Sequence, residues 1–449
     1  MTASRANFLE KVRRKEVTIA VIGLGYVGLP LAVGFARAGV RVCGIDVDPA
    51  KVAAINLGIS HIPDVPSATL ALEVQAGRLR ASMDCADCAQ ADAVVICVPT
   101  PFTRMKAPDL SFIEAAATGL APHIAPGVLV VLQSTTYPGT TMDLVRPILE
   151  AQGRLAGTDF LLAFYPKRID PGNKQYSAHN TPKVVGGIDP ASTEAAAALF
   201  SLLVPSDQIH RVSGPRVAEM CKLLENIFRS VNIALVNELA KLCDRMGIDI
   251  WEVIDAAATK PFGFMPFDPG PGVGGHCIPV DPYYLSWKAR EYDFYTKFIE
   301  LAAEVNTSMP FYTVNKLAES LNRQGKPLQR AKVLVLGAAF KKDIDDSRNS
   351  PALEVLRALR TRGAEVSYHD PYVPSVRLDG EHHAETAADV RLTSVPLTES
   401  LLAGQDCVCL AVAHSVFEIP WILKHSRLLL DATGVTRHFP PGSGTVIRL

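Results

Sequence analysis

Short apolar runs alternate with helical sequence along the first third of the chain. Residues 17–22 are apolar, β-branched and followed by glycines, as in a buried parallel strand. Residues 29–38 have a helical period, and Gly39 ends that helix. The pattern predicts strands at residues 17–22, 40–45, 93–98 and 128–132, with helical sequence between them. Such alternation predicts βαβ units and a parallel sheet with helices on both faces.

The middle of the chain changes to a helical pattern. A helical period runs from residue 214 to residue 246 with few breakers, and further helices are expected at 251–258 and 287–305. A polar join with Gly and Pro, near 323–330, precedes a second α/β series. The strands expected in that series are 332–337, 365–369, 408–412 and 427–430.

The first expected strand runs into the motif Gly23-x-Gly25-x-x-Gly28, which opens the first expected helix. Glycines at this spacing permit a tight turn and let backbone amides approach a pyrophosphate at the helix N-terminus. Asp46 ends the second strand, where its carboxylate can accept hydrogen bonds from a ribose diol and repel a 2′-phosphate. The motif therefore favours NAD over NADP. The second series has only Gly337-Ala338-Ala339, so that end either binds a different nucleotide or is purely structural.

These patterns predict an α/β protein with two Rossmann-like, doubly wound parallel-sheet domains joined by a helical central domain that contains a long helix. The second series repeats one detail of the first, because its strand 365–369 also ends on an aspartate, Asp370. The boundaries expected for the three domains are 1–205, 206–318 and 319–449.

Composition narrows the class of protein. With 48% hydrophobic and 20% charged residues the chain is ordinary for a globular protein, and its net charge of -1 gives no basic excess for a nucleic-acid partner. The first 16 residues lack the apolar core of a signal peptide, and no apolar stretch approaches the ~20 residues of a membrane span. Nine cysteines without regular spacing predict neither a disulfide framework nor a metal site, since Cys85 and Cys88 have no second pair. We expect a cytoplasmic protein.

Cys277 lies in a loop of glycines and prolines, residues 270–282, next to His276 and close to Asp281. Glycines on its N-terminal side allow a ligand to approach the sulfur, which favours a nucleophile. The alternative is a buried loop cysteine in a glycine-rich turn. On the long helix, Lys222 and Asn226 are four residues apart and share a face. They could stabilise an oxyanion, although such a pair is more often a solvated edge.

Together these residues resemble the nucleotide-sugar 6-dehydrogenase family, and within it the branch that acts on UDP-N-acetylglucosamine and UDP-N-acetylmannosamine. The likeness covers nearly the whole chain, and its most specific part is the cysteine block with His276 before Cys277. The segments that carry it are 23–30, 97–101, 134–141, the helix with Lys222 and Asn226, 260–267, 274–285, 340–343 and 346–348.

The resemblance implies a four-electron oxidation of a C6 hydroxyl with two NAD per turnover. Cys277 is implied to capture the aldehyde and to carry the thioester that water releases as the carboxylate. Lys222 and Asn226 are implied to stabilise the oxyanions, and Asp281 and Thr135 to position water. The resemblance also implies a homodimer built on the long helix, with higher oligomers left open.

The binding residues implied by the motif and the resemblance fall into two sets. For NAD they are Gly23, Gly25, Tyr26, Val27, Gly28, Asp46, Pro99, Thr100 and Thr135. For the UDP-sugar they are Lys167, Arg168, Lys222, Asn226, Gly274, Phe340, Lys341 and Arg348, of which Phe340, Lys341 and Arg348 would hold the UDP end.

Two positions depart from the family pattern. Lys167 replaces a glutamate of the acid–base set, and Gln133 stands where the acetamido-sugar branch commonly has glutamate. Lysine is a poor base at neutral pH unless it is desolvated or crowded by another cation, a role open to the neighbouring Arg168. Asp281, Asp170 or water relays could take over the missing role.

Three interpretations therefore remain open. The chain could be a full dehydrogenase, an altered enzyme that stalls at the thioester, stops at the aldehyde or prefers another sugar, or a paralogue that binds without turnover. A dehydrogenase of the 3-hydroxyacid or phosphogluconate type would share the first domain and the long helix but would not need the cysteine block. The yield of NADH per sugar nucleotide separates these interpretations. Two NADH fit the full dehydrogenase, one fits a form that stops at the aldehyde, and none fits a binding paralogue.

Overall fold

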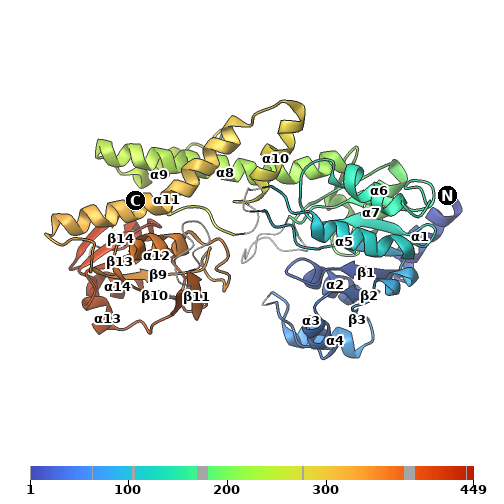
Figure 1. Ribbon diagram of the computed structural model, residues 1–449, viewed down its shortest axis with the longest axis horizontal. Coiled ribbons are helices and arrows are strands. Elements are labelled where there is room, and N and C mark those ends of the chain that lie inside the picture. Colours follow the sequence, from blue (N-terminus) through green and yellow to red (C-terminus); the bar gives the residue numbers. More distant parts are fainter. Residues whose placement is uncertain are drawn as a thin grey trace. The chain divides into compact units, whose positions relative to one another are not determined.

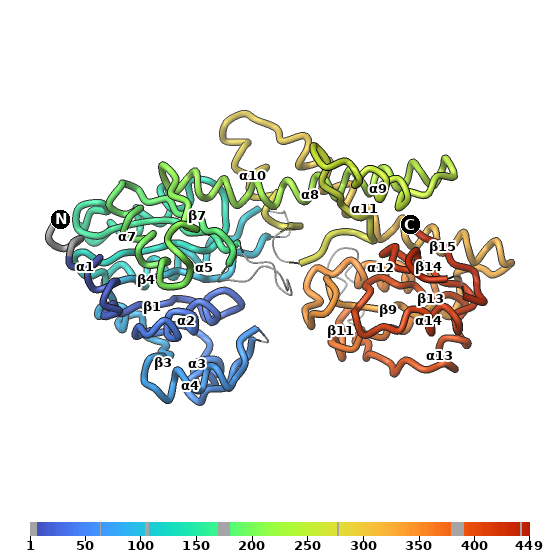
Figure 2. The backbone as a smooth tube through the Cα atoms, turned by 180° about the vertical axis from the view of Figure 1, so that it is seen from behind, coloured from blue at the N-terminus to red at the C-terminus, as the bar shows by residue number. Residues whose placement is uncertain are grey.

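The computed structural model describes residues 2–62, 64–103, 107–168, 180–275, 278–378, 390–440 and 442–449. The chain forms two compact units, Met1–Glu225 with Tyr283–Phe294, and Asn226–Pro282 with Tyr295–Leu449 (Figures 1 and 2). His276, Cys277 and Asp170 lie outside the described residues. Division into two units does not decide between two and three domains, so the predicted domain boundaries stay a prediction.

The first unit is built on a sheet of eight strands in the described residues (Figure 1). Six of them are parallel in the order β3-β2-β1-β4-β5-β6, and β7 then runs antiparallel to β6 and parallel to β8. In the order of the sheet the strands are β3 (Leu79–Ser82), β2 (Arg41–Ile45), β1 (Thr18–Ile22), β4 (Ala93–Ile96), β5 (Leu129–Leu132), β6 (Leu161–Phe164), β7 (Lys183–Gly187) and β8 (Ile209–Arg211). The predicted strands of this series are confirmed to within two residues at each end.

Helices cover both faces of this sheet, because its strands are apolar on both sides. One core contains residues of α1 (Thr2–Arg14), α2 (Gly28–Arg37), α3 (Pro49–Asn56), α4 (Ser67–Gln75) and α7 (Pro190–Phe200). The other core contains residues of α5 (Ser111–Leu120) and α6 (Arg146–Glu150). Successive residues of a strand alternate between these two cores, which decides the side on which each strand-end residue lies.

The second unit contains a smaller parallel sheet in the order β10-β9-β13-β14-β15. Its strands are β9 (Lys332–Leu336), β10 (Glu365–His369), β13 (Cys407–Leu410), β14 (Leu428–Asp431) and β15 (Thr445–Arg448), and a separate antiparallel pair is β11 (Ser375–Leu378) with β12 (Val390–Thr393). Its helices are α9 (Ile250–Ala258), α11 (Lys297–Arg323), α12 (Pro351–Thr361), α13 (Glu399–Ala403) and α14 (Ile419–His425). The predicted fold class, two parallel α/β sheets with a long central helix, is confirmed.

The long helix is α8 (Pro215–Met246), as the periodicity predicts. The predicted helix at 287–305 is wrong as one continuous helix, because residues 290–296 interrupt it. Helix α10 (Asp281–Ala289) ends in a 3₁₀ turn, and α11 begins only at Lys297. Asp293 between them has a φ of 53°, a left-handed conformation that aspartate tolerates and that cannot continue a helix. No helix in the described parts of the chain combines the length and apolarity needed to cross a membrane.

Candidate active site

The glycine turn lies between β1 and α2, as the motif predicts. A Cβ on Gly28 would lie 1.7 Å from the carbonyl oxygen of Gly23, so only glycine lets the helix start this close to the strand. A Cβ on Gly25 would have no other atom within 4 Å. The middle glycine therefore borders open space at the N-terminus of α2, and the turn fits the pyrophosphate of a dinucleotide.

Asp46 is held in place at the end of β2. Its carboxylate accepts hydrogen bonds from the backbone N–H of Leu24 (2.8 Å) and of Asp48 (3.0 Å), and only 8% of the residue is exposed. A carboxylate has about four acceptor positions, so it retains capacity for ribose hydroxyls. The Lys51 ammonium lies 3.7 Å from the Asp46 carboxylate and offsets part of its negative charge. This weakens the predicted repulsion between Asp46 and the 2′-phosphate of NADP.

Side-chain hydrogen bonds connect the residues that follow β4 with those that follow β5. The thiol of Cys97 donates to Gln133 Oε1 (3.1 Å), and Ser134 Oγ donates to the Val98 carbonyl (2.7 Å). Burial raises the pKa of the Cys97 thiol, so it stays a donor. Gln133 accepts this hydrogen bond without adding a negative charge to a buried site. The glutamine at position 133, which departs from the family pattern, therefore has a specific hydrogen-bond partner in Cys97.

Residues 99–101, which include the predicted Pro99 and Thr100, are anchored by a residue the sequence prediction missed. The phenol of Tyr284 on α10 donates to the carbonyl of Thr100 and lies 3.4 Å from that of Pro101. Tyr284 is fully buried. Its position inside the cysteine block was the available signal.

A second missed residue, Glu219 on α8, holds the loop that carries Thr135. Its carboxylate accepts from the backbone N–H of Gly139 (2.6 Å) and from the N–H and hydroxyl of Thr141 (2.9 and 2.6 Å). Glu219 is 1% exposed, and burial raises its pKa. The loop then enters a π-helix at Thr140–Val145, a feature that is frequent at functional sites. Thr135 itself is half-buried, between this anchor and the end of β5.

Asn226 and Asp281, two predicted catalytic residues, are in direct contact. The Asn226 side-chain amide donates to Asp281 Oδ2 at 2.5 Å, and these residues are 5% and 3% exposed. Lys222 lies one turn earlier on α8 and is also buried, at 8% exposed. The hypothesis of a solvated edge is therefore wrong for this pair. An amide has two N–H donors, so Asn226 can hold Asp281 and still offer one hydrogen to a ligand.

The glycines before Cys277 pack against the loop that follows β9. A Cβ on Gly274 would lie 2.7 Å from Phe340 Cβ and 2.8 Å from Pro351 Cδ. The side-chain amide of Asn349 donates to the Gly275 carbonyl (3.1 Å). The structure thus brings together Gly274 and Phe340, which the sequence assigns to the sugar nucleotide.

Replacing Gly274 with alanine should therefore displace the cysteine loop. The new methyl group meets backbone-proximal atoms rather than a flexible side-chain end, and such overpacking costs about 1–3 kcal/mol. We expect at least a tenfold loss of kcat/KM, on the order of 1.4 kcal/mol per factor of ten. The matched control is Gly270→Ala, because a Cβ there meets no atom closer than 3.8 Å. Equal activity of the two variants would contradict the close packing.

Lys167 and Arg168 contact different partners. The Lys167 ammonium lies 3.5 Å from the carbonyl of Tyr26 in the glycine turn. The Arg168 guanidinium pairs with Glu225 on α8 (2.7 Å) and donates to the Pro182 carbonyl (2.8 Å). The two predicted substrate residues therefore do not form a single cluster around Lys167.

In the second unit, Arg348 makes a two-pronged pair with Asp346 (3.0 and 2.8 Å), and Lys341 is half-buried in the same loop. Asp370, the counterpart of Asp46, accepts backbone N–H groups from Ala338, Ala339, Tyr372 and Val373 and pairs with His414 at 3.0 Å. These donors outweigh burial and lower its pKa to about 2. Asp370 is saturated by its own chain, which favours the structural alternative for this strand end.

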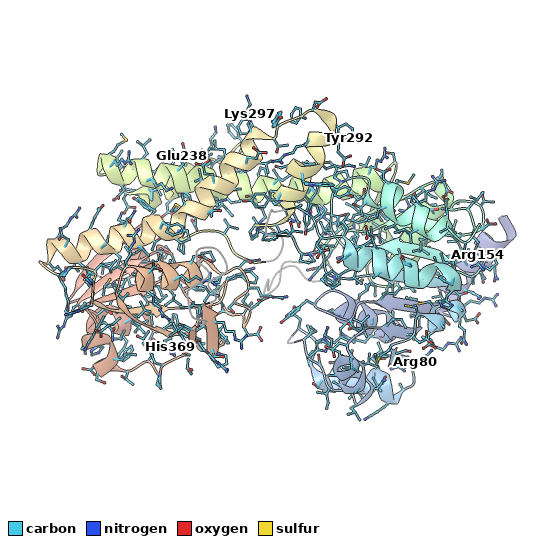
Figure 3. All side chains as sticks on the ribbon, in the orientation of Figure 1. Arg80, Arg154, Glu238, Tyr292, Lys297 and His369 are labelled. Atoms are coloured by element: carbon cyan, nitrogen blue, oxygen red, sulfur yellow. The ribbon has the colours of Figure 1, made fainter. Side chains whose placement is uncertain are left out.

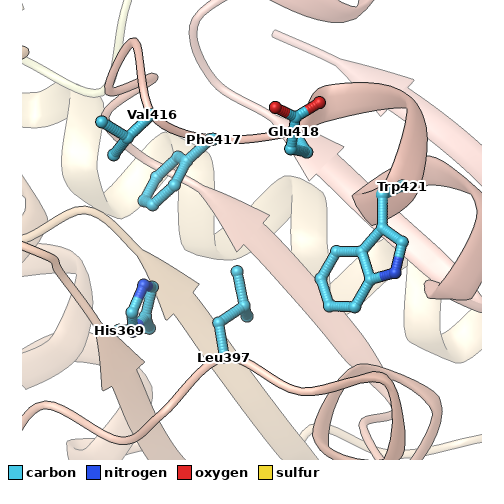
Figure 4. A pocket seen from close by; sticks show the side chains of 6 residues that line it. All are labelled: His369, Leu397, Val416, Phe417, Glu418 and Trp421. Carbon is cyan, nitrogen blue, oxygen red and sulfur yellow. The ribbon is translucent and has the colours of Figure 1, made fainter.

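A cavity of about 480 Å³ also lies in the second unit, where β10 ends and α14 begins (Figure 4). None of the predicted site residues lines it. Its walls are His369, Leu397, Val416, Phe417, Glu418 and Trp421. The predicted UDP residues are instead on the loop between β9 and α12.

Three family models cover most of the chain. They describe the NAD binding domain (residues 17–204), the central domain (216–308) and the UDP binding domain (334–438) of one family. The chain belongs to the UDP-glucose/GDP-mannose dehydrogenase family. It is therefore an NAD-dependent oxidoreductase, and the predicted cofactor NAD is confirmed.

Relatives in this family extend over nearly the full length of the chain. UDP-N-acetyl-D-glucosamine 6-dehydrogenase of Pseudomonas aeruginosa is 35% identical over 90% of this chain and 92% of the relative. UDP-N-acetyl-D-mannosamine dehydrogenase of Salmonella typhi is 35% identical over 94% and 99%. The structure of a UDP-D-ManNAc dehydrogenase from Pyrococcus horikoshii matches with a TM-score of 0.85 and 32% identity over 96% of this chain and 98% of that one.

Proposed function

We propose that this dehydrogenase oxidises the C6 hydroxyl of a UDP-N-acetylhexosamine, UDP-N-acetylglucosamine or UDP-N-acetylmannosamine, to the carboxylate with two NAD per turnover. The single observation that carries this is the buried Asn226–Asp281 contact. The proposed oxyanion donor Asn226 contacts the carboxylate of Asp281, which follows Cys277 by four residues in the sequence. Relatives named for both epimers match at 35% identity, which supports the acetamido sugar but not a choice between epimers.

The chemistry balances as two oxidations and one hydrolysis. Bound NAD supplies a hydride acceptor for each two-electron step. In the proposal, Cys277 thiolate adds to the aldehyde carbon to form a thiohemiacetal, whose oxidation gives the thioester. Water then attacks the thioester, the C–S bond breaks, and the thiol is regenerated with release of the carboxylate.

The chain's own residues divide this work. Lys222 and Asn226 stabilise the negative oxygen at each stage from one face of α8. Asp281, held by Asn226, and Thr135 position water for the hydrolysis. Gly23, Gly25, Tyr26, Val27, Gly28 and Asp46 hold the cofactor with Pro99, Thr100 and Thr135. Gly274, Phe340, Lys341 and Arg348 are proposed to hold the sugar nucleotide, and Lys167 and Arg168 are proposed as further sugar-nucleotide residues.

The substrate is tested by incubating the full-length protein with NAD and a panel of UDP-hexoses and UDP-N-acetylhexosamines. We expect NADH formation and a UDP-acetamido-uronic acid by mass spectrometry with at least one N-acetylated sugar. Oxidation of UDP-glucose alone would overturn the acetamido assignment. NADH with an aldehyde product would favour the altered enzyme, and sugar-nucleotide binding without NADH would favour a binding paralogue.

Lys167 is proposed to slow thioester hydrolysis relative to hydride transfer. The Lys167→Glu variant restores a carboxylate at this position, so we expect steady-state NADH formation to rise by about threefold to tenfold. Lys167→Gln is the matched control, since it removes the cation without adding a base. No gain in the glutamate variant, or an equal gain in the glutamine variant, would count against the hypothesis.

We further propose a homodimer through α8. A stripe of apolar residues on this helix is exposed, at spacings of four, three and four residues. Its members are Leu235 (54%), Leu239 (39%), Leu242 (51%) and Met246 (61%). Glu238 is exposed on the same helix and is labelled in Figure 3. A stripe of this kind is typical of a helix that packs against a second copy.

Introducing charged side chains into this apolar stripe should therefore dissociate the proposed homodimer. Light scattering of the wild-type protein should give twice the 48.4 kDa of one chain. The double variant Leu239→Glu with Leu242→Glu should give the mass of one chain, because two carboxylates cannot be desolvated in an apolar interface. Glu238→Gln is the control. A double variant that keeps the wild-type mass would place the interface elsewhere.

A further inference from the structure

Lys183, the first residue of β7, is a buried lysine. Neither the sequence motifs nor the family resemblance predicted it as a residue of the cofactor or substrate site. It is 3% exposed. Within the described residues, its ammonium has no hydrogen bond or ion pair with the protein. A lysine this deeply buried without a protein partner is unfavourable, so such side chains are normally paired or bind a ligand.

The surroundings of Lys183 are positive rather than negative. Burial, together with the nearby positive charges of Arg168 and Lys167, lowers the pKa of Lys183 to about 8. β7 pairs with β6 so that Ala163 lies opposite Gly187 and Phe164 opposite Gly186. Continued three residues further, that register sets Lys167 opposite Lys183. Two cations thus lie close together where the family has a glutamate in place of Lys167.

This cationic pair lies on the cofactor side of the sheet. Because β7 is antiparallel to β6, its first residue lies at the carboxyl ends of β1, β4, β5 and β6. Val185, two residues along β7, belongs to the core that also contains residues of α2, so Lys183 faces that side. Lys167, its neighbour, reaches the carbonyl of Tyr26 in the glycine turn. The open space at Gly25 belongs to the same turn.

We propose that Lys183 is an anion-binding residue of the cofactor site and that its ammonium pairs with the pyrophosphate of bound NAD. The pyrophosphate supplies the counter-charge that the described residues do not supply to Lys183. The charged or titratable groups that face Lys183 are Lys167 and Arg168 beyond β6. Cys97 at the end of β4 is also near Lys167, but burial keeps its thiol protonated. Lys183 is therefore the group whose protonation responds to the ligand.

The test uses ADP-ribose, which carries the pyrophosphate but not the nicotinamide, and measures its binding to the full-length protein by calorimetry. At pH 7 the Lys183→Met variant should bind about tenfold more weakly than wild type, and Lys183→Arg within about threefold, because arginine keeps the charge. Lys424→Met, an exposed lysine of α14, is the control and should bind as wild type does. Wild-type affinity in the folded Lys183→Met variant would overturn the proposal.

The pH dependence of the wild-type protein gives an independent readout. An anion pairs with the protonated amine, so affinity is full below pH 8 and is lost as the pH rises through 8. We expect binding to weaken by about fivefold from pH 7 to pH 9, and Lys167→Met to shift this loss to higher pH by removing a like charge. Constant affinity over this range would overturn the proposal even if Lys183→Met does not fold. Because ADP-ribose binding needs no sugar, this failure is distinct from failure of the proposed oxidation.

Discussion

The Cys277→Ser variant should lose carboxylate formation by about 10³-fold or more, since a serine hydroxyl is a far weaker nucleophile and leaving group than a thiolate. In the proposed mechanism the first oxidation does not need the sulfur of Cys277. We therefore expect at most one NADH per sugar and release of an aldehyde, followed by trapping with a carbonyl reagent and mass spectrometry.

The control for this variant is Cys243→Ser, a half-buried cysteine of α8 that packs against the core around Trp251. It should keep activity within about twofold of wild type, as a conservative change away from the site. Acid production by Cys277→Ser at an undiminished rate would remove the covalent step from the mechanism.

Replacing Asp281 with asparagine should reduce kcat by about 10²-fold or more, the size seen when one preorganised polar group is removed from a charge-stabilising site. The variant keeps the shape of the side chain and an oxygen for Asn226. What it loses is the negative charge that holds the Asn226 amide and that is proposed to position water in the hydrolysis.

The measurement is kcat and KM for NAD and sugar nucleotide in parallel. A loss in kcat with little change in KM is expected if Asp281 acts on the reacting group rather than on binding. Asp268→Asn, an exposed aspartate earlier in the same segment, is the matched control. A kcat within about threefold of wild type would show that the Asn226–Asp281 contact is only structural.

Most of the fold follows from local sequence. The strands predicted for the two sheets are mostly apolar and β-branched because they are buried, and they were placed to within two residues, whereas β3, β6, β7, β8 and β15 were not predicted. The antiparallel turn from β6 to β7 could not be placed, because strand direction is decided by pairing that is distant in the sequence. The break at Asp293 was missed because a single left-handed aspartate does not interrupt the helical period around it.

The site divides in the same way. The glycine turn and the cysteine loop are each one continuous stretch of sequence, so their residue spacing alone indicates their chemistry. Glu219 holds residues 139–141, which lie far from it in the sequence, and the proposed role of Lys183 rests on its burial and strand register. Neither residue has a neighbouring motif that distinguishes it from an ordinary surface residue. Lys167 could be identified as a departure, but its partner across the sheet, Lys183, could be found only from burial and strand register.

The number of NADH molecules formed per sugar nucleotide tests the central claim most directly, with the full-length protein, excess NAD and a limiting amount of the preferred UDP-N-acetylhexosamine. Two NADH and a carboxylate product are predicted, because the cysteine captures the half-oxidised sugar before it leaves. One NADH with free aldehyde, or none, would contradict the proposed four-electron oxidation.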